Sequence, residues 1–356
     1  MATAATASSR RLVFRAPRVV EVEDVPMPQP GPGQALVRGE WGLISTGTEM
    51  TAYTGDFPQP VSAWAAYVRY PFRPGYSLVG TVEATGPGCA LEPGQRIVSE
   101  ATHASHFLVD APAGAPAAGA AGRHPTANGI VCPDGVDPAD ATFHTLGRIV
   151  VNGLRLSRVQ FGECAAVVGC GLLGQLAIRI LRLAGALPVV AVDLAPARLD
   201  QARHSGADEL LQPGSGDPAR QLEDRNGGRL ADVVIDVTGA PASFPLATRL
   251  ARDLGRVVVL GSPRGPVTVD LHDDVHTRGL QVIGAHASTT PRAETPHTPW
   301  TMRRNTEYCL TLIRAGRLQV RDLVSHRFPL SRAAEAYAML DQDRTQAMGV
   351  LLELGA

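Results

Sequence analysis

The middle of the chain alternates short apolar runs with segments of helical periodicity. The apolar runs are residues 165–168, 189–192, 233–237, 257–260 and 282–284. Each run is too short for a helix and rich in valine, alanine or isoleucine, which is typical of strands buried on both faces. After the first run, apolar residues recur at helical spacing from Leu173 to Leu181. This alternation predicts α/β structure with a doubly wound parallel sheet.

The N-terminal flank has a different pattern. Residues 11–110 contain short alternating apolar runs separated by glycine and proline turns. This pattern predicts a barrel-like domain made of β structure. The following residues, 111–128, are rich in alanine, glycine and proline, and we expect a mobile surface loop there.

The C-terminal tail leaves the α/β pattern again. Helical patterns near residues 300–315 and 331–340 precede a last apolar run, residues 349–354, and we expect this tail to return to the β domain. The predicted division is therefore one β-barrel domain, residues 1–146 with 289–356, and one α/β domain, residues 147–288.

The composition narrows the classes of function. Hydrophobic residues make up 44% and charged residues 19% of the 356 residues, which is typical of a globular protein. The formal net charge of −1 favours neither nucleic acid nor an anionic membrane as a partner. No apolar run has membrane-spanning length and the first ten residues lack the apolar centre of a signal peptide, so we expect a cytoplasmic protein. No lysine is present, which excludes Schiff-base chemistry on lysine.

A glycine turn follows the first apolar run. Gly169, Gly171 and Gly174 have the spacing G-x-G-x-x-G. The first glycine permits a tight turn, the second lets the backbone approach a pyrophosphate, and the third lets the helix pack closely on the strand. Leu172 and Leu173 open the following helix, whose free N–H groups and partial positive charge attract phosphates. The segment predicts a dinucleotide site.

An acidic residue ends the second apolar run and bears on the choice of cofactor. Asp193 lies 193 − 174 = 19 residues after Gly174, close to the expected spacing of about 20. A carboxylate there accepts hydrogen bonds from the adenosine ribose 2′-hydroxyl and repels a 2′-phosphate. We therefore predict NAD as the cofactor. Arg198 keeps NADP open as the alternative, because an arginine accommodates a phosphate.

Further segments extend the pattern over the whole chain. They are residues 75–80, 92–98, 235–239, 259–262 and 283–286. Together with the glycine turn, they resemble the medium-chain dehydrogenase/reductase superfamily, which includes alcohol and polyol dehydrogenases. The resemblance implies a GroES-like β-barrel catalytic domain and a Rossmann domain that binds NAD(P), with the catalytic cleft between them. It also implies a homodimer or homotetramer.

The resemblance adds strand-end residues to the predicted cofactor site. Thr238, Gly261, Ser262, Ala285 and His286 follow predicted strands. Ligands bind at the carboxyl ends of strands in open α/β sheets, and in the relatives these ends touch the nicotinamide. His286 is also a second acid/base candidate, and its alternative role is packing at a subunit seam.

The chain departs from the zinc-dependent branch of this superfamily at its metal ligands. That branch has a cysteine before a hydroxyl residue and an acid, a histidine in a Gly-His-Glu segment, and a third ligand before the cofactor domain. Here Thr46 or Ser45 stands at the cysteine position, Tyr76 at the histidine position and His144 at the third position. One imidazole beside hydroxyls does not make a zinc site, which needs four good donors. We expect no bound metal.

Without a metal, other groups must take the hydroxyl proton and stabilise the alkoxide. The resemblance brings five candidates toward one cleft, namely Thr46, Thr48, Glu49, Tyr76 and His144. We predict His144 as the acid/base, Tyr76 as a donor to the substrate oxygen, and Thr48 as a proton relay. Glu49 orients a partner or binds a substrate hydroxyl.

Each role has an alternative. In the alternative, His144 would be a structural hydrogen-bonding residue and Tyr76 would fill the space of the missing metal. Glu49 would then anchor backbone N–H groups of its own loop. Two further histidines, His103 and His106, are expected at the surface or on a pocket wall.

These observations predict a zinc-independent NAD-dependent oxidoreductase that interconverts a polar secondary alcohol and a ketone. Two segments, residues 45–49 and 75–80, resemble hydroxyethyl-bacteriochlorophyllide, sugar and aminocyclitol dehydrogenases, some of them from secondary metabolism. We therefore expect a sugar, cyclitol or nucleoside-like substrate. The alternatives are a zinc-free NAD(P)H-dependent enoyl or quinone reductase, and a non-catalytic dinucleotide-binding protein.

Overall fold

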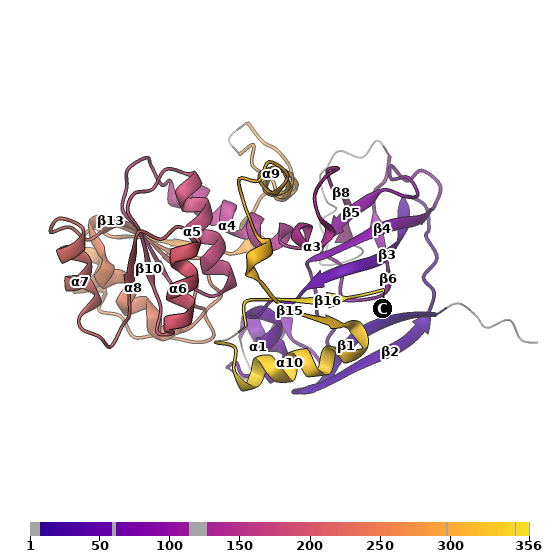
Figure 1. Cartoon of the computed structure of the whole chain (residues 1–356), viewed down its shortest axis with the longest axis horizontal. Helices are drawn as coiled ribbons and strands as arrows, with labels where there is room; N and C mark the ends of the chain where they lie inside the picture. The colour runs from indigo at the N-terminus through magenta and orange to yellow at the C-terminus, as the bar shows by residue number, and fades with distance from the viewer. Residues whose placement is uncertain (1–7, 59–61, 114–126, 297, 346, 356) are drawn as a thin grey trace, which may run out of the picture. The chain divides into compact units, whose positions relative to one another are not determined.

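The computed structural model describes residues 8–58, 62–113, 127–296, 298–345 and 347–355. Its internal contacts divide the chain into two units, Met1–Thr145 with Pro291–Ala356, and Leu146–Thr290 (Figure 1). The sequence pattern predicts these boundaries at residues 146 and 288. The loop predicted over residues 111–128 lies mostly outside the described residues.

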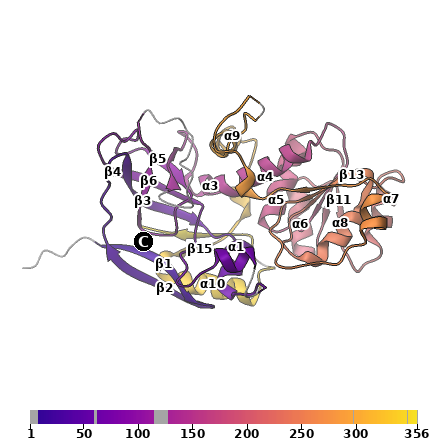
Figure 2. The same cartoon turned by 180° about the vertical axis from the view of Figure 1, so that it is seen from behind.

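The second unit, in which Figure 2 labels β11, β13 and the helices α5 to α8, contains a parallel sheet. Its strand order is β11-β10-β9-β12-β13-β14. Its strands are β9 (Ala165–Val168), β10 (Val189–Val192), β11 (Glu209–Leu211), β12 (Ala231–Asp236), β13 (Ala251–Val259) and β14 (Gln281–Gly284). All neighbouring strands pair in parallel. Every residue of β9 and β10 is buried, as their continuous apolar sequence predicts. This sheet confirms the predicted Rossmann fold.

Helices connect these strands. They are α5 (Leu172–Leu183), α6 (Pro196–His204), α7 (Pro218–Arg225) and α8 (Phe244–Leu250), with short helical turns at Pro241–Ser243 and Leu271–His276. Helix α4 (His144–Ser157) precedes β9, and a last helical turn, Ala287–Thr289, follows β14. Helix α5 packs on β9 and β10, whereas α8 packs on β12 and β13. From β9 the strand order runs toward β11 on one side and, after β12, toward β14 on the other, so the order reverses between β9 and β12. Open α/β sheets bind ligands at such a switch point.

The first unit is built from strands that pair mainly antiparallel. They are β1 (Ser8–Ala16), β2 (Val19–Pro26), β3 (Gln34–Leu43), β4 (Leu78–Thr85), β5 (Arg96–Ser99), β6 (His106–Asp110), β7 (Ala127–Asn128), β8 (Ile130–Val131), β15 (Val324–Pro329) and β16 (Gly349–Glu353). Strand β3 pairs with β4, with β6 through its first residues, and with β16 through its last residues. The C-terminal tail thus returns to the β unit, which has the predicted GroES-like architecture.

Short helices interrupt this unit, although only β structure was predicted for residues 11–110. They are α1 (Thr48–Thr54) and α2 (Ala63–Tyr67), and α3 (Pro138–Ala141) follows further along the chain. Helix α1 ends because Gly55 adopts a left-handed conformation with φ 70°, and α2 begins because the Ser62 hydroxyl accepts a hydrogen bond from the Ala65 N–H. A pattern of apolar runs does not detect such caps, so it does not predict the short helices that they begin and end.

The tail contributes the two helices that its sequence predicts, α9 (Met302–Arg314) and α10 (Ala333–Gln342). Helix α10 enters the core of the first unit through Tyr337, which is fully buried. Its ring lies 4.9 Å from Phe14 in an edge-to-face contact and 5.6 Å from Tyr53 in a stacked contact, measured between ring centroids. This aromatic cluster fixes α10 against β1 and α1. None of the helices in the described ranges has both the length and the apolar character needed to cross a bilayer.

Candidate active site

The glycine turn forms a cradle at the carboxyl end of β9. Gly169 has φ 94°, a conformation that side chains other than glycine rarely adopt. A Cβ atom at Gly174 would overlap the carbonyl oxygen of Gly169, whereas a Cβ at Gly171 would meet open space. Leu172 and Leu173 form the first turn of α5, whose N–H groups have no acceptor within the helix. The cradle fits a pyrophosphate, because the backbone is bare where the phosphates would lie.

Asp193, directly after β10, holds this turn in shape. One carboxylate oxygen, Oδ2, accepts a hydrogen bond of 2.7 Å from the Cys170 N–H, and Oδ1 accepts one of 2.8 Å from the Ala195 N–H. The Arg198 guanidinium lies 4.0 Å from Oδ2. Sequence reasoning missed this structural role of Asp193. Each carboxylate oxygen has a second lone pair, so the role is compatible with binding a ribose hydroxyl as well.

The remaining predicted cofactor residues lie at the carboxyl ends of neighbouring strands of the same sheet. Thr238 follows β12, Gly261 and Ser262 follow β13, and Ala285 and His286 follow β14. Because the strands are parallel and adjacent, these residues share one edge of the sheet with the glycine turn. The structure thus brings the predicted cofactor residues to one edge.

Two of these residues are fixed by local hydrogen bonds. The Thr238 N–H and hydroxyl both donate to Asp236 Oδ1, at 3.0 and 2.8 Å. The exposed His286 has its Nδ1 atom 2.7 Å from the Ser288 hydroxyl. Gly261 leaves no room for a side chain, because a Cβ there would lie 2.6 Å from the carbonyl carbon of Val237.

A cluster of hydroxyls lies in the first unit, where β3 leads into α1. The half-buried Tyr76 donates a hydrogen bond from its hydroxyl to Ser45 Oγ, and the Thr48 side chain is a second hydrogen-bonding partner of the phenol. Burial raises the pKa of Tyr76 above its ordinary value, against the opposing effect of these two hydrogen bonds. Tyr76 therefore keeps its proton and remains a hydrogen-bond donor. Thr46, also half-buried, lies next to Ser45 in the chain.

Glu49 lies behind this cluster and is buried, with 1% of its surface exposed. Its Oε1 atom accepts a hydrogen bond of 3.0 Å from the Ser45 N–H, and Oε2 contacts His103 Nε2 at 3.2 Å and accepts from the Tyr337 hydroxyl. These contacts match the alternative role, in which Glu49 anchors its own loop. The surface or wall position expected for His103 is wrong, because its side chain is completely buried.

His144, at the start of α4, is also buried, with 2% of its surface exposed. Burial lowers its pKa from the ordinary 6.5 to about 3, and hydrogen bonds with the backbone of Ser99 and Leu78 only partly oppose the shift. The Thr145 hydroxyl lies 3.2 Å from its Nδ1 atom. An imidazole with such a low pKa is a weak base near neutral pH. Burial therefore favours the structural alternative for His144 over the acid/base role.

When the pH falls, we expect the free energy of unfolding to decrease less in the His144→Gln variant than in the wild-type protein. Below pH 6.5 the unfolded chain protonates this imidazole, whereas the folded protein keeps it neutral down to about pH 3, so acidification favours unfolding in this window. The free energies of unfolding of the two proteins should therefore diverge by up to about 1.4 kcal/mol per pH unit below pH 6.5. Urea denaturation at a series of pH values measures this difference. Parallel pH curves for the two proteins would contradict the buried neutral state.

The residues at the positions that the resemblance matches to zinc ligands do not fit zinc. Thr46, Tyr76 and His144 offer two hydroxyls and one enclosed imidazole, whereas zinc prefers thiolate, imidazole and carboxylate donors. Throughout the described ranges, no group of three or more His, Cys, Asp and Glu side chains is arranged to hold a metal ion.

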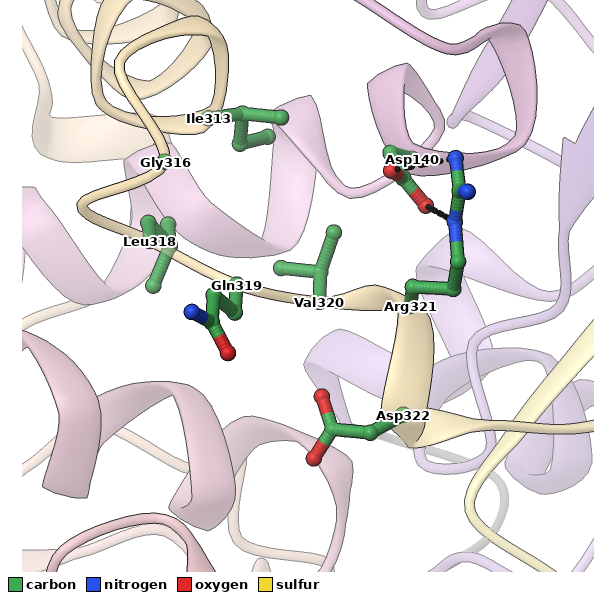
Figure 3. Close-up of a pocket in the computed structure, with 8 residues that line it drawn as sticks. All are labelled: Asp140, Ile313, Gly316, Leu318, Gln319, Val320, Arg321 and Asp322. Atoms are coloured by element: carbon green, nitrogen blue, oxygen red, sulfur yellow. Dashed lines mark hydrogen bonds and ion pairs between the residues drawn. The ribbon is translucent and has the colours of Figure 1, made fainter.

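The first unit also contains a pocket of about 450 Å³ away from the hydroxyl cluster (Figure 3). It is lined by Asp140, Ile313, Gly316, Leu318, Gln319, Val320, Arg321 and Asp322. The Arg321 guanidinium pairs with Asp137 at 2.7 Å and with Asp140 at 3.1 Å, so its charge is already balanced. None of the predicted catalytic or cofactor residues lines this pocket, and we assign it no role in the reaction.

The chain is similar to known dehydrogenases, in some cases over part of its length and in others over most of it. The family model of zinc-binding dehydrogenases matches residues 173–300. Sorbitol dehydrogenase from Homo sapiens is 27% identical over 364 residues, which cover 95% of this chain and 94% of that protein. L-threonine 3-dehydrogenase from Bacillus licheniformis is 29% identical over 185 residues, 52% of this chain, and the match spans only half the length of that relative.

A solved structure extends the likeness of fold to the whole chain. The alcohol dehydrogenase from Thermus sp. ATN1 has a TM-score of 0.76 and 24% identity, with 97% of this chain and 99% of that chain covered. At this identity the likeness supports the fold alone.

Proposed function

Because the chain belongs to the medium-chain dehydrogenase/reductase superfamily and is an oxidoreductase of that type, we propose that it interconverts a polar secondary alcohol and a ketone with NAD and without zinc. The observation that carries the proposal is the hydroxyl cluster of Ser45, Thr48 and Tyr76, in which Tyr76 stands at a position that the sequence resemblance matches to a zinc ligand. Hydroxyl donors aimed at a substrate oxygen supply the stabilisation that the metal supplies elsewhere.

The second unit has the groups to hold the cofactor. The backbone at Gly171 and the first turn of α5 would bind the pyrophosphate, and Asp193 would accept a hydrogen bond from the adenosine ribose. When bound, NAD supplies the acceptor for a hydride from the carbinol carbon. The negative charge of Asp193 favours NAD over NADP. In the alternative with NADP, the Arg198 guanidinium, which lies 4.0 Å from Asp193 Oδ2, would bind the 2′-phosphate.

The first unit would handle the proton. The Tyr76 hydroxyl donates to Ser45, and a substrate oxygen that replaces Ser45 as the acceptor would take this hydrogen bond instead. During oxidation the substrate hydroxyl would pass its proton to the Tyr76 oxygen while the phenol passes its own proton through Thr48 to water, and the re-protonated phenol would stabilise the alkoxide until its hydride leaves for NAD. In the reverse reaction Tyr76 gives its proton to the carbonyl oxygen and regains one through Thr48, which is in contact with the phenol.

We propose a polyhydroxylated substrate such as a sugar, a cyclitol or a nucleoside-like metabolite. Hydroxyl side chains such as Thr46, Thr48 and Ser45 can exchange hydrogen bonds with substrate hydroxyls as both donors and acceptors. The relative named sorbitol dehydrogenase acts, by its name, on a polyol. A homodimer or homotetramer and a cytoplasmic location stay predictions, as does the absence of nucleic-acid and membrane partners.

A cofactor and substrate screen on purified protein tests this function. The protein is dialysed against a chelator, its zinc content is measured, and NAD and NADP are each assayed with sugar alcohols, cyclitols and nucleosides. We expect NADH formation from at least one alcohol, with a rate that the chelator does not change and with NAD preferred. A rate lost with zinc and restored by zinc would contradict the metal-free proposal.

The same screen separates the alternatives. Oxidation of NADPH by enones or quinones, without oxidation of any alcohol, would favour the enoyl or quinone reductase. Binding of NADH without turnover of any of these substrates would favour a non-catalytic dinucleotide-binding protein.

A further inference from the structure

A buried polar cluster lies behind the hydroxyls, and its members come from distant parts of the chain. The Glu49 carboxylate, in α1, contacts His103 Nε2 at 3.2 Å and accepts a hydrogen bond from the hydroxyl of Tyr337, in α10. All three side chains have at most 1% of their surface exposed. A carboxylate at this depth is tolerated only when hydrogen-bond donors surround it, so the three residues depend on one another.

The His103 ring is held in a slot between two glycines. A Cβ atom at Gly42 would overlap His103 Nδ1, and a Cβ at Gly75 would lie 2.9 Å from the Cγ atom of the ring. The backbone is fixed as well, because the His103 N–H donates to the Pro74 carbonyl at 2.9 Å. Within the described part of the chain, Nδ1 has no hydrogen-bond partner, so the side chain is bonded through Nε2 to Glu49 alone.

These contacts reach both segments that carry the hydroxyls. Glu49 Oε1 accepts from the Ser45 N–H at 3.0 Å and thereby fixes the turn that presents Ser45 Oγ and Thr48 Oγ1. His103 packs on Gly75, the residue before Tyr76. The Tyr337 phenol lies near enough to Tyr76 for the two to interact electrostatically. The buried cluster thus contacts Ser45 on one side of the Tyr76–Ser45 hydrogen bond and, on the other side, Gly75, which precedes Tyr76 in the chain.

We propose that Glu49, His103 and Tyr337 form a positioning cluster that holds the hydroxyls of Ser45, Thr48 and Tyr76 in the arrangement needed for proton transfer. The cluster does not touch substrate and acts only through the turn of residues 45–49 and the segment of residues 74–76. Its effect on turnover rests on the function proposed above, whereas its effect on the geometry of Tyr76 does not.

Tyr337→Phe tests the proposal, because it removes one donor to Glu49 and keeps the aromatic packing. The matched control is Tyr53→Phe, since Tyr53 stacks on Tyr337 while its hydroxyl lies near Arg18 and Asp341 instead of Glu49. Each protein is labelled with 3-fluorotyrosine, and the fluorine resonance of Tyr76 is assigned among the six tyrosines with Tyr76→Phe. This readout needs no substrate.

We expect the Tyr76 resonance to shift by more than its linewidth in Tyr337→Phe and to stay in place in Tyr53→Phe. With a substrate from the screen, kcat of Tyr337→Phe should fall about tenfold at unchanged KM, because the loss of one hydrogen bond to a charged group disturbs geometry and not substrate binding. Glu49→Gln, which keeps the size of the side chain, should shift the same resonance and serves if Tyr337→Phe does not fold.

An unmoved Tyr76 resonance in the folded variants, or an equal shift in Tyr53→Phe, would overturn the positioning cluster. A wild-type protein that oxidises no alcohol would instead overturn the proposed function, and the fluorine spectra would still decide the positioning role. The two proposals therefore fail by different observations.

Discussion

Replacing Tyr76 by phenylalanine is expected to lower kcat by about 10²-fold or more, the usual contribution of a positioned proton donor. The phenol donates to Ser45, is in contact with Thr48, and keeps its proton because burial raises its pKa. Phenylalanine removes the phenolic proton that is donated to Ser45 and leaves the ring in place. Since the ring packing is kept, KM and the melting temperature should change little. Steady-state kinetics with the best substrate of the screen measure the effect.

Tyr70→Phe is the matched control for this prediction. Tyr70 belongs to the same unit and donates from its hydroxyl to the backbone carbonyl of Ala52, away from the hydroxyl cluster. The control loses one tyrosine hydrogen bond, so its kcat should stay near the wild-type value. If Tyr76→Phe also keeps the wild-type kcat, the phenol merely fills the space of the missing metal.

Replacing Gly171 by valine is expected to weaken NADH binding by about 100-fold or more without unfolding the protein. Gly171 has an extended backbone that valine adopts readily, and a Cβ atom there would point into open space. That space is where the pyrophosphate must approach the backbone, so the side chain excludes the cofactor and removes charge-assisted hydrogen bonds of about 1.5–3 kcal/mol each. Calorimetric titration with NADH gives the Kd, and thermal melting without cofactor reports the fold.

Gly174→Ala provides the contrast within the same turn. A Cβ at Gly174 would overlap the backbone oxygen of Gly169, so this variant should lose thermal stability even without cofactor. Gly171→Val therefore tests whether the turn must leave space for the cofactor, whereas Gly174→Ala tests whether it must leave space for the backbone of Gly169. An unchanged Kd in Gly171→Val would mean that the pyrophosphate does not lie on this turn.

The local parts of the fold could be predicted because their signals are contiguous in sequence. The runs that form β9 and β10 are bounded by turn residues and were predicted with the boundaries that the structure has. The strand β13, by contrast, begins at Ala251 and not near residue 257. Its first six residues, Ala-Arg-Asp-Leu-Gly-Arg, mix polar and apolar types, and its pairing with β12 is irregular there, so an apolar-run pattern gives no signal for them.

The site was predictable only in part. Tyr76 and Thr48 were singled out, and the structure brings both into one hydroxyl cluster with Ser45. Tyr337 carries no local signal, because it reads as one more apolar position on an amphipathic helix. Its partner Glu49 lies 288 residues away in the chain. His103 was expected at the surface or on a pocket wall, yet the slot between Gly42 and Gly75 encloses it, and neither glycine is near it in the sequence.

The sequence by itself determined the α/β class and the glycine turn with Asp193 after the next strand, because each depends on residue type and spacing within a short stretch. Only the tertiary structure decided that His144 is buried with a pKa of about 3, and that the Glu49 carboxylate accepts a hydrogen bond from the backbone of its own loop. Burial and partnership arise when segments far apart in the chain pack together, and desolvation by that packing sets which groups hold a proton.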